Sequence, residues 1–345
     1  MGLAPYGAPK YVEKILTHLI ELKEAGSFIL NQDYFNYMGG LTMTNSKFEE
    51  LFGGPRRKPE SKLTQKEMDL ARSIQEVPEL AVVRIARVAR KITQSKNLCM
   101  AGGVALNCVA NGKLLREGIL ENIWIQPAAG DAGGALGAAQ VAFYRFSNQR
   151  RVPDSNDSMH GAFLGSQYSN SEIEAFLKEI GAIYVKMEME EIFSKSAEFL
   201  DQGKILGWFQ GRMEFGPRSL GARSIFGDPR NPNMQKEMNL RTKFREGFRP
   251  FAPAVLKESV SEYFEFNSDS PYMQFVASVH PSIRRESINV DQNLWGIDQL
   301  NTSRSSLPAI THIDYSARIQ TVDVTRNPIF YGLLKAFQKK PFVRY

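Results

Sequence analysis

The sequence contains little cysteine and no long hydrophobic run. Its 345 residues include two cysteines, Cys99 and Cys108, both in apolar or glycine-rich surroundings. Two thiols cannot form a metal cage by themselves, so buried thiols are the simpler interpretation. The apolar stretches are far shorter than the roughly 18 residues that suggest a membrane span, and no basic segment followed by an apolar one marks a signal peptide. These absences predict a cytoplasmic protein without a membrane partner.

The positive charge is concentrated in one window. The composition, 43% hydrophobic and 23% charged, is that of a globular protein, and the length suits two domains. Residues 201–257 contain eleven Lys/Arg against five Asp/Glu, whereas the remainder has 32 of each, so the window carries the whole formal net charge of +6. Such a window concentrates anions if it folds into a concave surface, although charge alone leaves a solvated basic face open.

The spacing within this window favours an anion site. In "GRMEFGPRSLGARSIFGDPR" (211–230) the arginines alternate with glycine and proline instead of following helical spacing beside acidic partners. Glycines let backbone N–H groups approach a bound anion, and the guanidinium fork matches phosphate oxygens bidentately. "RTKFREGFRPFAP" (241–253) repeats the pattern, with cations placed between phenylalanines.

Hydrophobic periodicity predicts a mixture of helices and strands. One helix is expected over 11–23 and another over 65–96, interrupted or begun again near Pro78. In the second helix the expected buried stripe is Ala81, Val82, Ile85, Val88 and Ile92. The polar segment 147–160 predicts a domain boundary, and a helix followed by a strand is expected twice, over 169–185 and 194–211.

Two further segments predict strand-turn-helix units. They are "NLCMAGGVALNCVANGKLL" (97–115) and "NIWIQPAAGDAGGALGAAQVAF" (122–143). Glycines at the carboxyl end of a strand allow a nucleotide to approach the backbone, although neither segment contains a dinucleotide or P-loop motif. Asp131 occupies the expected position of a helix N-cap, and a structural cap is the alternative to a functional role.

Seven blocks, in order, resemble the signature blocks of the O-carbamoyltransferases typified by nodulation protein U (the NodU/CmcH family). They are "MGLAPYG" (1–7), "GGVALNC" (102–108), "GDAGGALGAA" (130–139), "GWFQGRMEFGPRSLGARSIFGDPR" (207–230), "KFREGFRPFAPAVL" (243–256), "SPYMQFV" (270–276) and "THIDYSARIQTV" (311–322). The resemblance implies an α/β fold with a partial ASKHA (actin/hexokinase-like, TsaD-like) domain over residues 1–150. A YrdC-like α/β domain would follow over residues 151–345.

The resemblance also implies an activity and its residues. The YrdC-like domain would convert carbamoyl phosphate and ATP into carbamoyl-adenylate, and the carbamoyl group would pass to a hydroxyl of a small-molecule acceptor. The residues implied around the phosphates are Arg212, Arg218, Arg223, Lys243, Arg245 and Arg249, with His312 and Arg318 on a closing loop. Those implied at the second nucleotide site are Gly102, Gly103, Asn107, Gly130, Gly133 and Gly134. Asp131 would bind a divalent metal (Fe, Zn, Mn or Mg), whereas a hydrogen-bonded loop histidine is the alternative for His312.

The sequence departs from the family at both ends. The family's metal site uses a histidine pair spaced H-x-x-x-H, and none of the four histidines here is so spaced. Family members also continue beyond the helix expected over 328–338 into a block resembling "NTSFN". We therefore expect this chain to be the central part of a longer protein and not to carry out the transfer step alone.

Two alternatives stay open. One is an inactive fragment that keeps a nucleotide- or phosphate-binding site. The other is a nucleic-acid-binding protein related to tRNA modification, which an isoelectric point near 9.1 favours. Interleaving of the cations with glycine and proline, instead of exposed aromatic residues, argues against nucleic acid as a partner. The sequence also leaves open whether the chain forms a homodimer.

Overall fold

The computed structural model describes residues 1–59, 61–153, 157–285 and 294–340, which form two compact units. Unit 1 comprises Met1–Leu98, Val109–Trp124 and Ile288–Thr302, and unit 2 comprises Cys99–Cys108, Ile125–Ser287 and Ser303–Tyr345. The expected domains, 1–150 and 151–345, stay predictions, and part of the expected boundary segment, residues 154–156, lies outside the described residues. Within the described ranges no helix has both the length and the apolar character needed to cross a membrane.

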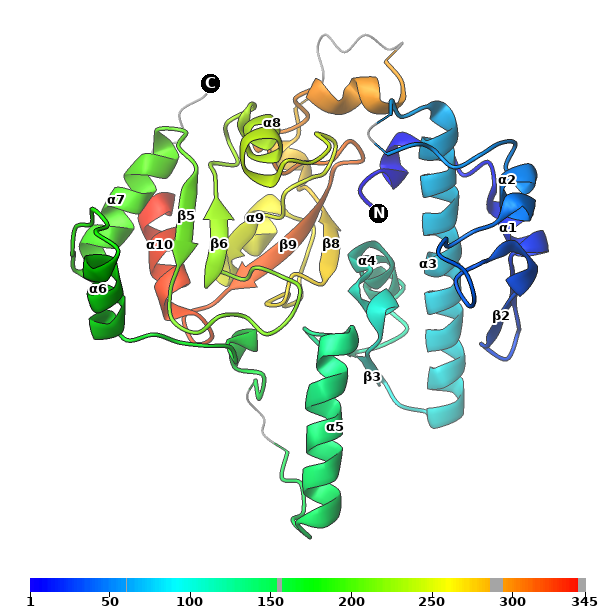
Figure 1. Ribbon diagram of the computed structural model, residues 1–345, viewed down its shortest axis with the longest axis horizontal. Coiled ribbons are helices and arrows are strands. Elements are labelled where there is room, and N and C mark those ends of the chain that lie inside the picture. Colours follow the sequence, from blue (N-terminus) through cyan, green and yellow to red (C-terminus); the bar gives the residue numbers. More distant parts are fainter. Residues whose placement is uncertain (60, 154–156, 286–293, 341–345) are drawn as a thin grey trace. The chain divides into compact units, whose positions relative to one another are not determined.

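Unit 1 is mainly helical. Its elements are α1 (Val12–His18), β1 (Ile20–Leu22), β2 (Phe28–Leu30), α2 (Ser46–Leu51), α3 (Gln65–Thr93) and nearly all of α4 (Cys108–Arg116) (Figure 1). The helix expected over 11–23 is shorter than predicted, because residues 20–22 pair antiparallel with 28–30 in a hairpin. Gly26, at φ +85°, lies in the hairpin turn, where only glycine adopts such a backbone without strain.

Helix α3 differs from its sequence prediction in two respects. It begins at a capping box formed by Thr64 and Glu67 and continues through Pro78 without a break. Proline removes one backbone donor, and the long helix keeps its remaining hydrogen bonds on both sides. The expected stripe was also wrong in part, because Ile85 and Ile92 are exposed. The buried apolar residues of α3 are Met68, Val77, Val82, Val83 and Ala86.

The two expected strand-turn-helix units are present. Strands β3 (Asn97–Met100) and β4 (Asn122–Ile125) form a two-stranded sheet. The carbonyl of Lys96 accepts from the N–H of Glu121, and that of Met100 accepts from Gln126, so both strands run in the same direction. The short helix η3 (Gly103–Leu106) and α4 follow β3, and α5 (Asp131–Phe146) follows β4.

Unit 2 combines helices with two small sheets. Its remaining elements are α6 (Asn170–Glu179), α7 (Met189–Asp201), β5 (Leu206–Phe209), β6 (Arg223–Phe226), α8 (Met234–Glu237), the π-helix η5 (Met238–Lys243), β7 (Ala254–Leu256), α9 (Val260–Tyr263), β8 (Phe275–Ser278), β9 (Ser316–Val322) and α10 (Pro328–Gln338). Strand β6 pairs antiparallel with β5, while β9 lies between β7, which is parallel to it, and β8, which is antiparallel.

This arrangement confirms a mixed α/β chain, while the ASKHA and YrdC-like assignments stay predictions. The strand expected near residues 183–185 is not formed, and that prediction was wrong. In the described part of unit 2, strand β5 pairs only with β6, and Ile183 is fully exposed. An apolar run without a neighbouring strand gains no ladder hydrogen bonds and stays irregular.

An aromatic core holds the end of the arginine-rich segment. Phe226 on β6 and Phe330 on α10 stack with ring centroids 4.9 Å apart and planes 9° from parallel. Gly221 lies against this core at φ +103°, where an added Cβ would approach a Phe330 ring carbon to 2.2 Å. Trp208 Nε1 donates to the Gly221 carbonyl at 3.0 Å. Helix α10 packs beside α7 on this core, as Figure 1 shows.

Candidate functional site

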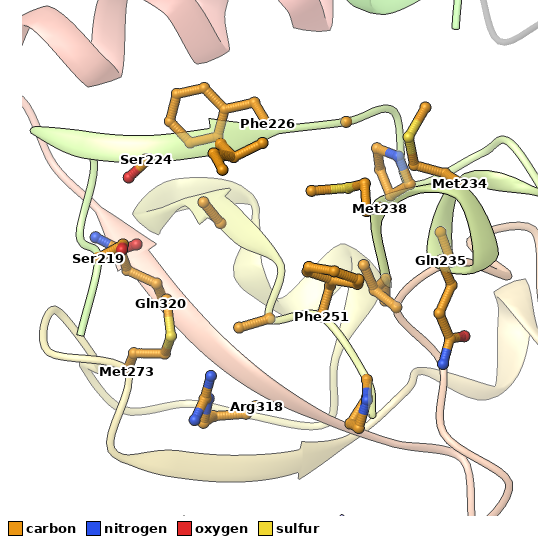
Figure 2. Close-up of a pocket in the computed structure, with 18 of the residues that line it drawn as sticks. Ser219, Ser224, Phe226, Met234, Gln235, Met238, Phe251, Met273, Arg318 and Gln320 are labelled. Atoms are coloured by element: carbon orange, nitrogen blue, oxygen red, sulfur yellow. The ribbon is translucent and has the colours of Figure 1, made fainter. Parts of the chain in front are cut away.

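Unit 2 contains a cavity of about 380 Å³ lined by residues of β6, β9, α8, α10 and the segment 243–252. In Figure 2, Ser224 and Phe226 lie along β6, while Arg318 and Gln320 project from β9. Met238, at the start of η5, and Phe251, in the segment 243–252, also line the cavity. The cavity therefore brings together residues that are almost a hundred positions apart in the sequence.

The lining combines positive charge with an extended apolar surface. Four cations line the cavity: Arg218, Lys243, Arg245 and Arg318. The large apolar side chains include Phe226, Met234, Met238, Phe251, Ile310, Leu333 and Phe337. A small set of polar groups in a mainly apolar cleft is the usual composition of a small-molecule site, where the polar groups orient the ligand. This composition suits a molecule with an anionic group and a flat apolar part.

None of the four lining cations forms an ion pair with a carboxylate in the described part of the chain. Arg218 donates from Nη2 to the carbonyl of Leu106 at 3.2 Å, and its buried Nε has no hydrogen-bond partner. Arg245 donates from Nε to the side chain of Asn239 at 2.7 Å. Buried polar groups are usually satisfied, so the orphaned Nε of Arg218 points to a missing acceptor.

Three other arginines in the same window form ion pairs with carboxylates. Arg223 Nε lies 3.2 Å from Glu214, and Arg249 Nε lies 2.9 Å from Glu246. Arg230 is buried and forms ion pairs with Asp228 and Asp201. Within the described residues, the cavity is thus lined by three cations of the window that lack a carboxylate partner: Arg218, Lys243 and Arg245.

The environment of the cavity lowers the pKa values of Arg218 and Arg245. Burial lowers the pKa of Arg218, and the like charge of Arg318 lowers it further. Burial likewise lowers the pKa of Arg245, with additional repulsion from Arg249 and Arg318. Arginine remains protonated in proteins, so the repulsion persists as an unfavourable interaction that a bound anion would relieve. The three guanidinium groups are therefore arranged to attract negative charge.

Glu214 organises the loop that carries Arg218. Its buried carboxylate accepts hydrogen bonds through Oε1 from three backbone N–H groups of one short segment: those of Leu220 at 2.6 Å, Ala222 at 2.9 Å and Arg223 at 3.3 Å. A carboxylate that bonds several backbone donors fixes a loop lacking regular structure. The sequence analysis did not select Glu214, although it is one of only two acids in the basic glycine-rich segment 211–230, which is a signal that could have identified it.

Other residues expected around the phosphates do not line the cavity. Arg212 is exposed and donates to the carbonyl of Gly165 at 3.1 Å, and Arg223 and Arg249 are occupied as described. His312 is buried, with Nδ1 3.6 Å from Asp314 Oδ1. The roles predicted for these four residues stay predictions, whereas Arg218, Lys243, Arg245 and Arg318 share one cavity.

The polar residue Gln320 was not selected from the sequence. It donates from Nε2 to the carbonyl of Leu220 at 2.9 Å, which joins β9 to the arginine loop. Side chains two positions apart on a strand share a face, so the alternation of Arg318 and Gln320 in "ARIQ" was the available signal. The cavity also has Ser219, Ser224 and Gln235 on its wall.

The glycine turns after β3 and β4 lie next to each other. Gly102 N–H donates to the carbonyl of Ala129 at 2.7 Å, and Gly102 has φ +96°. Gly103 begins η3 and Asn107 follows it, while Gly130 is the N-cap of α5. Added Cβ atoms at Gly102, Gly103, Gly130 and Gly134 would meet nothing within 4 Å, whereas one at Gly133 would meet the Ala128 carbonyl at 2.1 Å. The turns leave backbone open, which a nucleotide would need.

Asp131 does not have the neighbours of a metal centre. It is the first residue of α5, one position after the N-cap at which it was expected, and its side chain is exposed. The described residues contain no group of three or more His, Cys, Asp or Glu placed to hold a metal ion. A transition metal ordinarily takes several protein ligands, so the donor set around Asp131 does not fit a metal ion.

Comparison with known proteins identifies the family. A family model described as "Carbamoyltransferase N-terminus" matches residues 1–140, and one described as "Carbamoyltransferase C-terminus" matches residues 197–344. This chain belongs to the carbamoyltransferase family. The C-terminal match contains all four cations of the cavity, and the N-terminal match contains both glycine turns.

Individual relatives agree with this assignment. An uncharacterised protein of Synechocystis is 56% identical over 98% of this chain and 55% of its own length. Nodulation protein NolNO of Sinorhizobium fredii is 37% identical over 99% of this chain and 45% of its own length. A 3'-hydroxymethylcephem-O-carbamoyltransferase of Amycolatopsis lactamdurans is 28% identical over 98% and 55%, respectively. The chain thus spans about half the length of the curated relatives it matches.

Proposed function

We propose that this chain takes part in ATP-dependent O-carbamoyl transfer to a small-molecule hydroxyl. The cavity of unit 2 would bind carbamoyl phosphate and ATP and form carbamoyl-adenylate. The glycine turns after β3 and β4 would serve the transfer of the carbamoyl group. Membership of the carbamoyltransferase family and the printed name of the Amycolatopsis relative support the reaction class.

The observation that carries the proposal is the set of four lining cations that have no carboxylate partner among the residues the structure describes. ATP and carbamoyl phosphate repel each other, and their reaction requires that both be held close with this repulsion neutralised. Arg218, Arg245 and Arg318 offer guanidinium forks to phosphate oxygens, and Lys243 adds a point charge. The apolar wall with Phe226 and Phe251 suits a nucleobase.

The proposed reaction has three steps. Water replaces the phosphate of carbamoyl phosphate, which releases inorganic phosphate and leaves carbamate. A carbamate oxygen then attacks the α-phosphorus of ATP, the bond to the β-phosphate bridging oxygen breaks, and pyrophosphate leaves. An acceptor hydroxyl finally attacks the carbamoyl carbon, loses its proton and displaces AMP. In the second step the arginines would stabilise charge that develops on the leaving pyrophosphate.

Arg218 would connect the two parts of the proposed reaction. Its guanidinium lines the cavity and donates to the carbonyl of Leu106, the last residue of η3 after the Gly102-Gly103 turn. Movement of η3 would therefore displace Arg218, which would contact the adenylation substrates. The cytoplasmic location, the divalent metal and the homodimer stay predictions.

Isotope exchange between pyrophosphate and ATP in the presence of carbamoyl phosphate tests the adenylation step directly. We expect exchange by the wild type and a loss of about tenfold or more in Arg218→Ala and Arg318→Ala, because each removes a charged hydrogen-bond donor. Lys236→Ala is the matched control, since Lys236 is an exposed cation on α8 that does not line the cavity.

The outcomes separate the alternatives. Pyrophosphate binding without exchange would favour a chain that keeps only a phosphate site. Steeply salt-dependent binding of tRNA that Arg218→Ala weakens would favour the nucleic-acid alternative. Exchange that survives both cavity substitutions would contradict the assignment of the site.

A further inference from the structure

Asn239, in the π-helix η5, is fully buried and uses both ends of its side-chain amide. Its Oδ1 accepts a hydrogen bond from Arg245 Nε at 2.7 Å. Its Nδ2 donates to the carbonyls of Gly247 at 3.2 Å and Arg249 at 3.0 Å, and its own carbonyl accepts from the N–H of Arg245 at 3.1 Å. Four bonds from one residue thus define the loop that follows η5.

These contacts fix the side chain of Arg245 from two directions. Asn239 holds Nε, and the guanidinium carbon lies 4.8 Å from the centroid of the Phe251 ring. A free arginine side chain has many rotamers, and freezing them on ligand binding costs affinity. Because Nε is already occupied, the terminal Nη1 and Nη2 pair is the part of Arg245 left to meet an anion in the cavity.

We propose that Asn239 is a positioning residue that presents the terminal nitrogens of Arg245 to the anionic ligand of the cavity. This inference rests on the proposed function, since it assumes that the cavity binds a phosphate-containing ligand. Asn239 does not line the cavity itself and acts through Arg245. Arginine held by a neutral amide keeps its full charge for the ligand, whereas a carboxylate in the same place would neutralise it.

If Asn239 only stabilised the loop that follows η5, its substitution should have the same effect on Arg245 as substitution of another residue that binds this loop. Gln235 binds the same loop, because its Nε2 donates to the carbonyls of Gly247 at 3.2 Å and Arg249 at 3.4 Å. Gln235 makes no hydrogen bond to Arg245 among the described residues. Gln235→Ala therefore loosens the loop while leaving the Nε contact of Arg245 in place. Because Gln235 also lines the cavity, this variant is the control for the contact in the ligand-free protein and not for ligand binding.

A double-mutant cycle with inorganic pyrophosphate as the probe tests the proposal. Calorimetry on the full chain should give an affinity about 3- to 10-fold weaker for Asn239→Ala and weaker still for Arg245→Ala. Asn239→Ala added to Arg245→Ala should cause no further loss, because the residue acts through the arginine. An equal loss from Asn239→Ala in both backgrounds, or no loss in either, overturns the proposal.

A second substitution covers the case in which Asn239→Ala does not fold. Arg245→Lys keeps the charge and the bonds of Asn239 to Gly247 and Arg249, but it removes the Nε donor. We expect it to weaken pyrophosphate binding about 3- to 10-fold, and affinity equal to that of the wild type overturns the proposal.

The Nε–H NMR signal of Arg245, assigned by its loss in Arg245→Lys, reports the contact without any ligand. It should exchange slowly with solvent in the wild type and in Gln235→Ala, and rapidly in Asn239→Ala. Rapid exchange in the wild type overturns the proposal. If the signal is protected but the wild type does not bind pyrophosphate, the contact between Asn239 and Arg245 exists and the proposed function is refuted instead.

Discussion

Arg230 donates to the carboxylate of Asp228 through Nε at 2.9 Å and through Nη2 at 2.7 Å, and both side chains are buried. Asp201 accepts a third bond at 2.6 Å, and the guanidinium stacks on the Phe337 ring. Burial acts to lower the pKa of Arg230, but the two carboxylates outweigh it and raise the pKa. Arg230 therefore ties its loop to α7 and α10, whereas Arg218, in the loop before β6, has no carboxylate partner among the described residues.

Arg230→Ala should lower the free energy of unfolding by about 3–5 kcal/mol, because it leaves Asp228 buried without a cation. Arg218→Ala should cost little stability, since it removes a guanidinium that has no ion pair. Urea denaturation of both variants beside the wild type measures the difference. Equal midpoints for Arg230→Ala and the wild type would refute the structural role of Arg230.

Arg218→Ala should weaken binding of carbamoyl phosphate or pyrophosphate by about 1.5–3 kcal/mol, the range for a hydrogen bond to a charged group. Arg218→Lys should restore only part of this loss, because lysine lacks the bidentate fork. Arg212→Ala and Arg249→Ala should have smaller effects, since neither residue lines the cavity. Calorimetry gives the affinities, and the same affinity in all four variants as in the wild type would refute the site.

Glu214→Ala should destabilise the arginine loop by about 3 kcal/mol or more, because three backbone donors lose their acceptor. Glu214→Gln should cost less, since the amide oxygen can replace Oε1 while the charge opposite Arg223 is lost. Denaturant unfolding ranks the two variants. A glutamine variant as unstable as the alanine variant would show that the charge, and not the acceptor, holds the loop.

The stability of unit 2 should decrease at acidic pH through Asp269. Burial acts to raise the pKa of this carboxyl, but the bond from Thr321 and the charges of Arg326 and Lys257 lower the pKa below its ordinary value of 3.8. A depressed pKa in the folded state stabilises the fold above pH 3.8, and the contribution disappears as pH falls through the folded-state pKa.

Unfolding measured in urea at several values between pH 7 and pH 3 tests this expectation. Asp269→Asn should reduce stability at neutral pH and flatten the decline below about pH 4, because the substituted side chain does not titrate. Glu262→Gln, at an exposed position of α9, is the control and should keep the wild-type profile. An unchanged acid profile in Asp269→Asn would exclude this carboxyl as its cause.

Local patterns predicted much of the secondary structure and failed where a distant segment decides the outcome. The strands before Gly102 and Gly130 and the helices after them follow from short apolar runs and the glycines that end them. The helix expected over 11–23 ends early because β2 offers backbone partners to residues 20–22. The run at 183–185 remains irregular because the described chain supplies no neighbouring strand.

By itself, the sequence determined that the excess positive charge lies within residues 201–257 and predicted an anion site there, because charge, glycine and proline are properties of adjacent residues. It could not determine which cations remain without acidic partners, since Asp201 reaches Arg230 from 29 positions away. It also could not place Arg318 beside Arg218, because that requires β9 to lie at the cavity. Only tertiary structure decides these pairings, since electrostatic energy depends on distance and burial in space and not on separation along the chain.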